Sequence, residues 1–451
     1  MIMMRRKNAA IILPVCMGII IAFAACTPNT GNTETGGSTK TGNPIKIVPI
    51  TPKALLSPDD IDMAARTAAA GANDFAFRLS AALVKNQDDA NFVCSPYSVW
   101  MPLAALLNAT NAENKEALLA ALGAAGITEA DMNRAASRML YDMTKLGNKE
   151  YEKYIEDYKY YNPLRIANAI FVDKTVTLRT DFAQTFMDYY RGASINVDFT
   201  SRNAVDAVNQ WASDNTEGLI TNLIKEFSQD TVAAIANAIY FSDRWSWEFN
   251  SSQTTEDIFH APKGDGTAWY MLRQGEALYY EDDKVQAMPL SFKLDGGMYI
   301  ILPKDGNATE LLSSMTADYF REIRHNTERA EGKLLLPRFS IETKIDSLAD
   351  ALKELGVPLF DAESAPITGL IKEYPLFISD AIQKAVIKVD EEGTTAAAVT
   401  VLGMDGAAGG EEPPPPKPFE MICDKPFVFI LYEYTVDGGA QILFTGVVNQ
   451  P

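Results

Sequence analysis

Residues 391–412 read Glu-Glu-Gly-Thr-Thr-Ala-Ala-Ala-Val-Thr-Val-Leu-Gly-Met-Asp-Gly-Ala-Ala-Gly-Gly-Glu-Glu, and four prolines follow at positions 413–416. Between the two acidic pairs the side chains are small or β-branched, and Asp405 carries the single charge. The segment is too apolar for an ordinary loop and too rich in glycine for an ordinary strand. It also comes directly after a β-like run at residues 385–389.

Alternation along this segment favours a strand that forms only under some conditions. The even-numbered positions make one face: Thr394, Ala396, Ala398, Thr400, Leu402, Met404 and Gly406. The charge of Asp405 falls on the opposite face. A segment that must sometimes pair inside a sheet needs this uncharged, small face. The segment alone is also compatible with a low-complexity linker.

The rest of the body mixes helix and strand patterns. Helical spacing marks residues 75–83, 99–107 and 348–355, and apolar runs mark strands at residues 298–302, 427–432 and 442–448. Ser95 and Pro96 predict the start of the second helix, and Gly356 the end of the third. The last two strands flank Asp-Gly-Gly and should form a hairpin buried on both faces.

The pentapeptide Ile-Ala-Asn-Ala-Ile occurs at residues 166–170 and again at residues 235–239. It is too short to indicate a repeat architecture, so each copy predicts an apolar strand in a similar sheet environment. No break in composition separates residue 61 from residue 450. We therefore expect one large domain over these residues.

Composition excludes several classes of function. The 451 residues include 40 Lys and Arg against 59 Asp and Glu, a formal charge of −19, which argues against a broad nucleic-acid surface. His260 and His325 are the only histidines, and there is no phosphate loop, nucleophile elbow or zinc-protease motif. We expect no enzymatic activity, no metal and no cofactor. Cys94 and Cys423 lie in apolar contexts and should be free buried thiols.

The N-terminus has the pattern of an export segment. Three basic residues at positions 5–7 precede an apolar run at residues 9–25, and Cys26 follows small residues. This arrangement resembles a bacterial lipoprotein signal, in which Cys26 is lipidated. An ordinary cleaved signal and an uncleaved anchor are the alternatives. We expect a signal segment at residues 1–26, a flexible tether at 27–58 and a domain at 59–451 that is exported and anchored at the bacterial cell envelope or cell surface.

From about residue 60 to the C-terminus the chain resembles the serpins. The resemblance is carried by separated motifs in the same order: Asn91-Phe-Val-Cys-Ser95-Pro96-Tyr-Ser98, Asn237-Ala-Ile-Tyr-Phe241 with Trp245, Leu336-Pro337-Arg338-Phe-Ser340, Glu391-Glu-Gly393-Thr394, Lys425-Pro426-Phe427 and Phe444-Thr-Gly446-Val-Val-Asn449-Gln-Pro451. It implies a single α+β domain with helices packed around a large central sheet, two smaller sheets and an exposed reactive loop at about residues 391–418.

The resemblance also implies roles for residues. The hinge of the reactive loop would comprise Glu391, Gly393, Thr394, Thr395, Ala396, Ala397 and Ala398. The residues that gate the opening of the sheet would be Ser95, Ser98, Asn237, Trp245, Arg338 and Gln383. Arg338 and Glu391 match an ion pair at the top of the sheet. Gln383 stands where the family often has histidine, so this gate should not respond to pH.

In serpins a target protease cleaves the loop, which then inserts into the central sheet while the protease stays covalently attached. The count from Gly393 places the cleaved bond at Ala407–Ala408, with Met404–Asp405 as the alternative, because residues 409–418 are longer than usual. A small residue at the bond suits an elastase- or subtilisin-like serine protease. We expect a monomer that needs no heparin-like cofactor, given the acidic charge.

Two other functions remain open from the sequence. The long Gly- and Pro-rich stretch after Ala408 is compatible with a non-inhibitory serpin-fold protein that binds partners or acts like a chaperone. A hydrolase or a substrate-binding lipoprotein is a third reading, which has no catalytic group of residues to support it.

Overall fold

The computed structural model describes residues 15–25, 63–85, 87, 89–145, 153, 164–364, 366–392, 416–435 and 439–451. Its helices are α1 Met63–Val84, α2 Pro96–Leu106, α3 Ala112–Ala121, α4 Glu129–Thr144, α6 Thr180–Tyr190, α7 Arg202–Asn215, α8 Ala308–Ser314, α9 Ala317–His325 and α10 Leu348–Glu354. None of these helices combines the length and the hydropathy that a membrane crossing requires.

The strands of the same described residues make two sheet systems. They are β1 Val15–Ala25, β2 Phe92–Cys94, β3 Leu164–Asp173, β4 Gly192–Val197, β5 Thr231–Phe241, β6 Thr255–Phe259, β7 Gly266–Glu281, β8 Val285–Ser291, β9 Gly297–Pro303, β10 Glu328–Pro337, β11 Phe339–Ile345, β12 Leu376–Val389, β13 Lys417–Ile422, β14 Phe427–Tyr434 and β15 Ala440–Val448. The central sheet has the order β11-β12-β1-β5-β3-β4.

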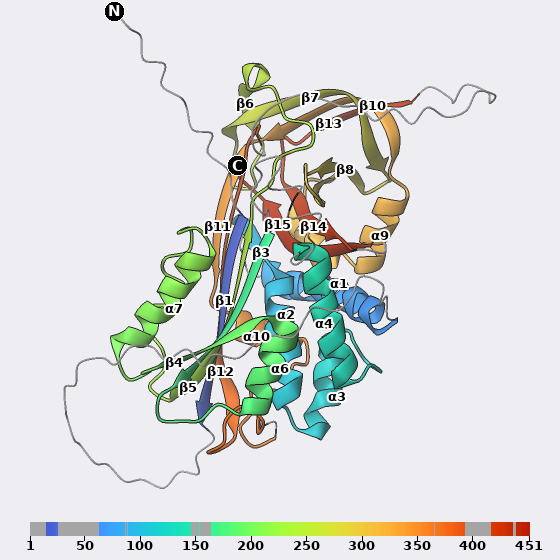
Figure 1. Ribbon diagram of the computed structural model, residues 1–451. Helices are drawn as coiled ribbons and strands as arrows, with labels where there is room; N and C mark the ends of the chain where they lie inside the picture. Colours follow the sequence, from blue (N-terminus) through green and yellow to red (C-terminus); the bar gives the residue numbers. More distant parts are fainter. Residues whose placement is uncertain are drawn as a thin grey trace, which may run out of the picture.

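The other strands follow the order β13-β10-β7-β8-β9-β14-β15-β2, with β6 beside β7. The long strand β7 pairs with β10 along most of its length and with β8 at its end, so it joins the two smaller sheets that we expected into one connected path. Figure 1 shows α7 on one face of the central sheet and α2, α4 and α6 on the other. The predicted α+β architecture is confirmed.

Local sequence signals account for several element boundaries. Ser95 accepts a hydrogen bond from the backbone N–H of Ser98 and caps α2, with Pro96 in the first turn. Gly356 has a φ of +84° just beyond α10, a backbone conformation that residues with a Cβ atom rarely adopt. The predicted hairpin is present as β14 and β15, and nearly all of its side chains are buried.

The two copies of the repeated pentapeptide lie on neighbouring strands and pair with each other. Asn168 in β3 is opposite Asn237 in β5, and the flanking isoleucines are also opposite one another. The expectation of similar sheet environments is therefore confirmed. An antiparallel pair places these two asparagines on the same face of the sheet.

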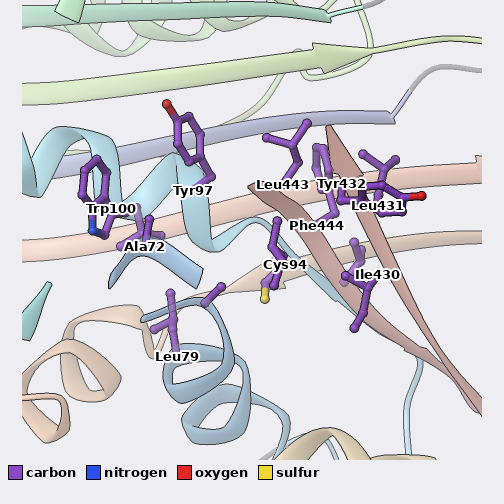
Figure 2. Close-up of a cluster of buried hydrophobic side chains, with 14 of the residues drawn as sticks. Ala72, Leu79, Cys94, Tyr97, Trp100, Ile430, Leu431, Tyr432, Leu443 and Phe444 are labelled. Atoms are coloured by element: carbon purple, nitrogen blue, oxygen red, sulfur yellow. The ribbon is translucent and has the colours of Figure 1, made fainter. Parts of the chain in front are cut away.

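The main core lies between the central sheet, the inner helices and the β14–β15 hairpin. Figure 2 shows part of this core, with side chains from α1 and α2 packed against the hairpin. Cys94 and Cys423 are buried and free, as predicted. Burial raises the pKa of the Cys94 thiol to about 11, so the thiol stays protonated at neutral pH.

Part of the N-terminal apolar run lies in the central sheet. Its residues 15–25 form β1 between β12 and β5, antiparallel to both strands. Cys26 and the expected tether at 27–58 lie outside the described residues. The export role of the run therefore stays a prediction, whereas its pairing in the sheet was not anticipated from the sequence.

Candidate functional site at the end of strand β12

The expected hinge begins where β12 ends. This strand finishes at Val389, and residues 390–392 are the last that the structure describes before Pro416. The hinge positions Gly393, Thr394, Thr395, Ala396, Ala397 and Ala398, and the candidate bonds Ala407–Ala408 and Met404–Asp405, lie outside the described residues. The described chain resumes at Pro416, and β13 begins at Lys417, close to the expected end of the loop.

Arg338 and Glu391 form the expected ion pair at the top of the sheet. The Nε of Arg338 donates to Oε2 of Glu391 at 2.7 Å, and the Nη2 of Arg338 donates to Oε1 of Glu391. The hydroxyl of Thr254 also donates to Glu391. Burial raises the pKa of Glu391, but the hydrogen bonds from Arg338 and Thr254 outweigh burial and hold this pKa below its usual value of 4.5. Glu391 is thus charged and fixed.

Trp245 holds the residue before Glu391. Its indole N–H donates to the carbonyl oxygen of Asp390 at 3.0 Å, and its ring stacks on Phe292 with centroids 4.9 Å apart. The backbone N–H of Phe249 donates to the carbonyl oxygen of Glu391 at 3.1 Å. The start of the hinge is therefore tied to the body by both backbone and side-chain contacts.

A second group of expected residues lies away from the end of β12, on strands β5 and β12 and at the start of α2. Gln383 of β12 donates from Nε2 to the carbonyl oxygen of Ser95 at 2.9 Å. Asn237 of β5 donates from Nδ2 to Oδ1 of Asn168 at 2.8 Å. Ser95, Ser98, Asn237 and Gln383 all have no exposed surface. The structure thus separates the predicted gating residues into two groups, one at the end of β12 and one where the start of α2 packs against the central sheet.

The second group contains buried polar atoms without hydrogen-bond partners among the described residues. They are Oγ of Ser98, Oδ1 of Asn237 and Oε1 of Gln383. Leaving such atoms unpaired costs about 1–3 kcal/mol each. Ile19 of β1 lies opposite both Asn237 and Gln383 in the strand register, so an apolar residue separates the two amides.

Comparisons with known proteins decide the family. The family model for serpins, described as serine protease inhibitors, matches residues 70–451. The chain belongs to the serpin family. An uncharacterised serpin-like protein of Methanosarcina acetivorans is 29% identical to this serpin over 416 residues, covering 89% of this chain and 92% of the relative. Plasminogen activator inhibitor 1 of Mus musculus is 28% identical and covers 84% and 92%.

Solved structures agree on the fold of this serpin. Tengpin, a thermophilic serpin in the native state, gives a TM-score of 0.70 at 23% identity, over 89% of this chain and 98% of tengpin. Human glycosylated kallistatin gives 0.70 at 22% identity, over 86% and 99%. At this identity the likeness supports the architecture and carries no statement about targets.

Sequence reasoning missed two partners of the site in this serpin. Thr254 binds Glu391, and Asn168 binds Asn237. The repeated pentapeptide was the signal that could have pointed to Asn168, because identical apolar strands with a central asparagine can pair symmetrically. Thr254 follows a short turn and carries no comparable pattern.

The hinge contacts border an open cleft of about 710 Å³. It lies between the adjoining ends of β11 and β12, residues 248–251 and the C-terminal Pro451. No cluster of three or more metal-ligating side chains occurs in the described part of the chain. The contacts at Asp390 and Glu391 anchor the chain where β12 ends.

Proposed function

We propose that this serpin inhibits a serine protease as a suicide substrate, through cleavage of the reactive loop and its insertion into the central sheet. One observation carries the proposal: the sheet accepts a strand between β5 and β12, antiparallel to both. A loop that leaves the end of β12 and folds back must run antiparallel to β12. The inserted loop would need a strand position beside β12 that runs antiparallel to it, and the position between β5 and β12 meets both requirements.

The chemistry needs a cleavable peptide bond and a mobile strand from this chain. The protease serine attacks the loop carbonyl carbon, the C–N bond breaks, and the new amine leaves with the C-terminal part of the chain as the ester forms. Insertion then adds about a dozen backbone hydrogen bonds, each worth roughly 0.5–1.5 kcal/mol net. Their sum is comparable with the stability of a whole domain, which suffices to displace the attached protease.

Small residues in the loop suggest the class of target. Cleavage at Ala407–Ala408 suits an elastase- or subtilisin-like protease with a small apolar pocket, and Met404–Asp405 is the alternative. The mouse relative is named as an inhibitor of plasminogen activator, which supports protease inhibition as the class of activity. We expect a monomeric inhibitor that forms a covalent complex without a heparin-like cofactor.

Incubation with a panel of serine proteases tests the proposal. We expect a detergent- and heat-resistant complex with an elastase-like member, and mass spectrometry of the released C-terminal peptide identifies the bond. Thr394→Arg places a charge on the face that enters the sheet and should convert the inhibitor into a substrate, whereas Thr394→Ser should not. Cleavage with free, active protease across the whole panel would contradict the proposal.

A non-inhibitory binding or chaperone-like function is the second candidate, motivated by the Gly- and Pro-rich stretch at residues 409–416. Thermal unfolding before and after loop cleavage separates the two. An inhibitor gains a strand on cleavage and its melting temperature rises. A protein that does not insert its loop melts at nearly the same temperature.

We also propose that Cys26 is lipidated and anchors the mature protein at the cell envelope. The basic residues, the apolar run and the small residues before Cys26 support this. Cys26→Ser should abolish incorporation of labelled fatty acid and release the protein from the membrane fraction. Unchanged labelling of the variant would refute the anchor.

A further inference from the structure

Strand β1 lies where the reactive loop is proposed to insert. Its backbone pairs with β12 from Cys16 opposite Val386 to Ala25 opposite Leu376. On its other side it pairs with β5 from Val15 opposite Phe241 to Ala24 opposite Thr231. The two ladders, each with one register shift near Phe23, leave no room for another strand between β5 and β12. The N-terminal segment and the reactive loop would therefore compete for one position.

The described side chains of β1 fit this position on both faces of the sheet. Ile19 and Ile21 belong to the main core on the α2 side. Ile20 belongs to the cluster with Phe171 and Val208 under α7. Ile19, Ile20 and Ile21 are each at most 1% exposed. An apolar export-type sequence suits a strand buried on both faces, because such a strand has no polar side.

The polar residues beside Ile19 indicate that the sheet has a second arrangement. Because β1 is antiparallel to both neighbours, β5 and β12 run parallel to each other. With β1 between them their axes are about 9.6 Å apart, and direct pairing would bring them to about 4.8 Å. Asn237 and Gln383 lie at the same level, so direct pairing would place their amides side by side. Their unpaired oxygens, Oδ1 and Oε1, could then accept hydrogen bonds.

We propose that residues 15–25 form a removable strand that keeps the sheet closed to the reactive loop until the segment is cut off. The occupant is the N-terminal segment of the same chain. Hydrolysis of the Ala25–Cys26 peptide bond by an endopeptidase consumes one water and leaves a carboxylate on Ala25 and an amine on Cys26. Once β1 is lost, β5 and β12 can pair directly with each other. When these two strands later move apart, the reactive loop can enter between them. The consequence for inhibition rests on the proposed function, whereas the strand assignment does not.

A disulfide that uses the native Cys16 tests the strand and its register. In full-length, unprocessed protein with Cys26→Ser, the variant Val386→Cys places a second thiol opposite Cys16. Mild oxidation should give an intramolecular disulfide between positions 16 and 386. Asp380→Cys, which lies on the same strand opposite Ala22, is the matched control and should give none. Tyr240→Cys repeats the test from β5, should Val386→Cys fold poorly.

The outcome of the oxidation is read by mass spectrometry and non-reducing gels. Equal cross-linking of the Val386→Cys and Asp380→Cys variants, or none from β5 and β12, would overturn the strand assignment. A dimer linked through these cysteines would show that a second copy supplies the strand, which also overturns the proposal as stated.

Competition with the loop is tested by a charge in the strand. Ile20→Asp buries a carboxylate under α7 and should expel β1. Ile12→Asp makes the same change at a position that precedes the first residue of β1 and serves as the control. We expect hydrogen exchange at residues 15–25 to become fast in Ile20→Asp alone. The yield of covalent protease complex should rise by roughly tenfold or more in that variant.

The failures of the two proposals are distinguishable. Equal exchange and equal yield in the two variants would overturn the removable strand. No complex from any form, together with the Cys16 disulfide, would overturn the proposed inhibition and leave the strand assignment supported.

Discussion

The guanidinium of Arg338 holds both carboxylate oxygens of Glu391 at the point where β12 ends and the hinge begins. Arg338 directly precedes β11, and β11 is the outer neighbour of β12. Glu391 is 6% exposed and Arg338 is 43% exposed by side chain, so the acid is fixed within the body while the base lies partly in solvent. This pair fastens the start of the loop to the edge of the central sheet.

Glu391→Gln should weaken the contact between Arg338 and the start of the loop. The change removes the charge that two donors of Arg338 and the hydroxyl of Thr254 recognise, and we expect a loss of about 1–2 kcal/mol in the free energy of unfolding. Glu328→Gln at the exposed Lys417–Glu328 pair is the matched control, expected to cost less than about 0.5 kcal/mol. Urea unfolding measures both, and equal losses would refute a special role for Glu391.

The same pair predicts an acid dependence of stability. The pKa of Glu391 is lower in the folded protein than its usual value of 4.5. Its contribution to stability is therefore complete above pH 4.5 and is lost as the pH falls through the lower folded value. The difference in stability between wild type and Glu391→Gln should shrink on acidification in that range. A difference that stays constant down to about pH 2 would contradict the assignment.

The sequence predicted those features of the fold that depend on interactions between residues close together in the chain. Ser95 with Pro96 predicts a helix start, because a capping oxygen and a fixed φ act within one turn. The hairpin of β14 and β15 followed from two apolar runs around a turn. The match of Arg338 and Glu391 came from a family resemblance, since 53 positions separate them and no local pattern connects them.

Pairing between distant strands could not be predicted in this way. An apolar run at the N-terminus satisfies the requirements of an export signal and of a doubly buried strand equally well, because both demand uninterrupted hydrophobicity. The placement of Ile19 between Asn237 and Gln383 depends on register, which no single strand encodes.

Gln383→His should introduce a pH response that the wild type lacks at this position. A histidine with no exposed surface is held neutral by burial, so its folded pKa falls below the unfolded value of about 6.5. The unfolded chain then binds more protons, and stability decreases as the pH falls below about 6.5. Thermal unfolding between about pH 5 and pH 8 measures the effect against wild type. If the difference in thermal stability between Gln383→His and wild type does not change with pH over that range, the new imidazole reaches solvent.

The buried Glu433 should give the opposite dependence of protein stability on pH. Burial raises its pKa well above 4.5, and the charge of Asp295 adds to burial while Lys145 opposes it. The folded protein holds a proton that the unfolded chain releases above about pH 4.5, so the wild type loses stability as the pH rises.

Glu433→Gln should remove that slope without changing the shape of the side chain. The two proteins should have similar stability near pH 4, and the variant should be the more stable of the two at pH 8, because only the wild type must either hold a proton or bury a charge there. Denaturant unfolding at both pH values decides, and a variant less stable at pH 8 would mean that Glu433 is ionised and paired.

Trp245 should report the release of the hinge. Its indole donates to Asp390 and stacks on Phe292, so departure of the hinge from the body changes the surroundings of one buried ring. We expect loop cleavage to change tryptophan emission in the wild type and to leave it nearly unchanged in Trp245→Phe, which keeps the stacking and loses one hydrogen bond worth about 1 kcal/mol. Trp247→Phe is the control, since Trp247 lies two residues away and is 54% exposed. Stopped-flow emission after protease addition makes the measurement, and a signal that survives in Trp245→Phe but vanishes in Trp247→Phe would place the moving contact elsewhere.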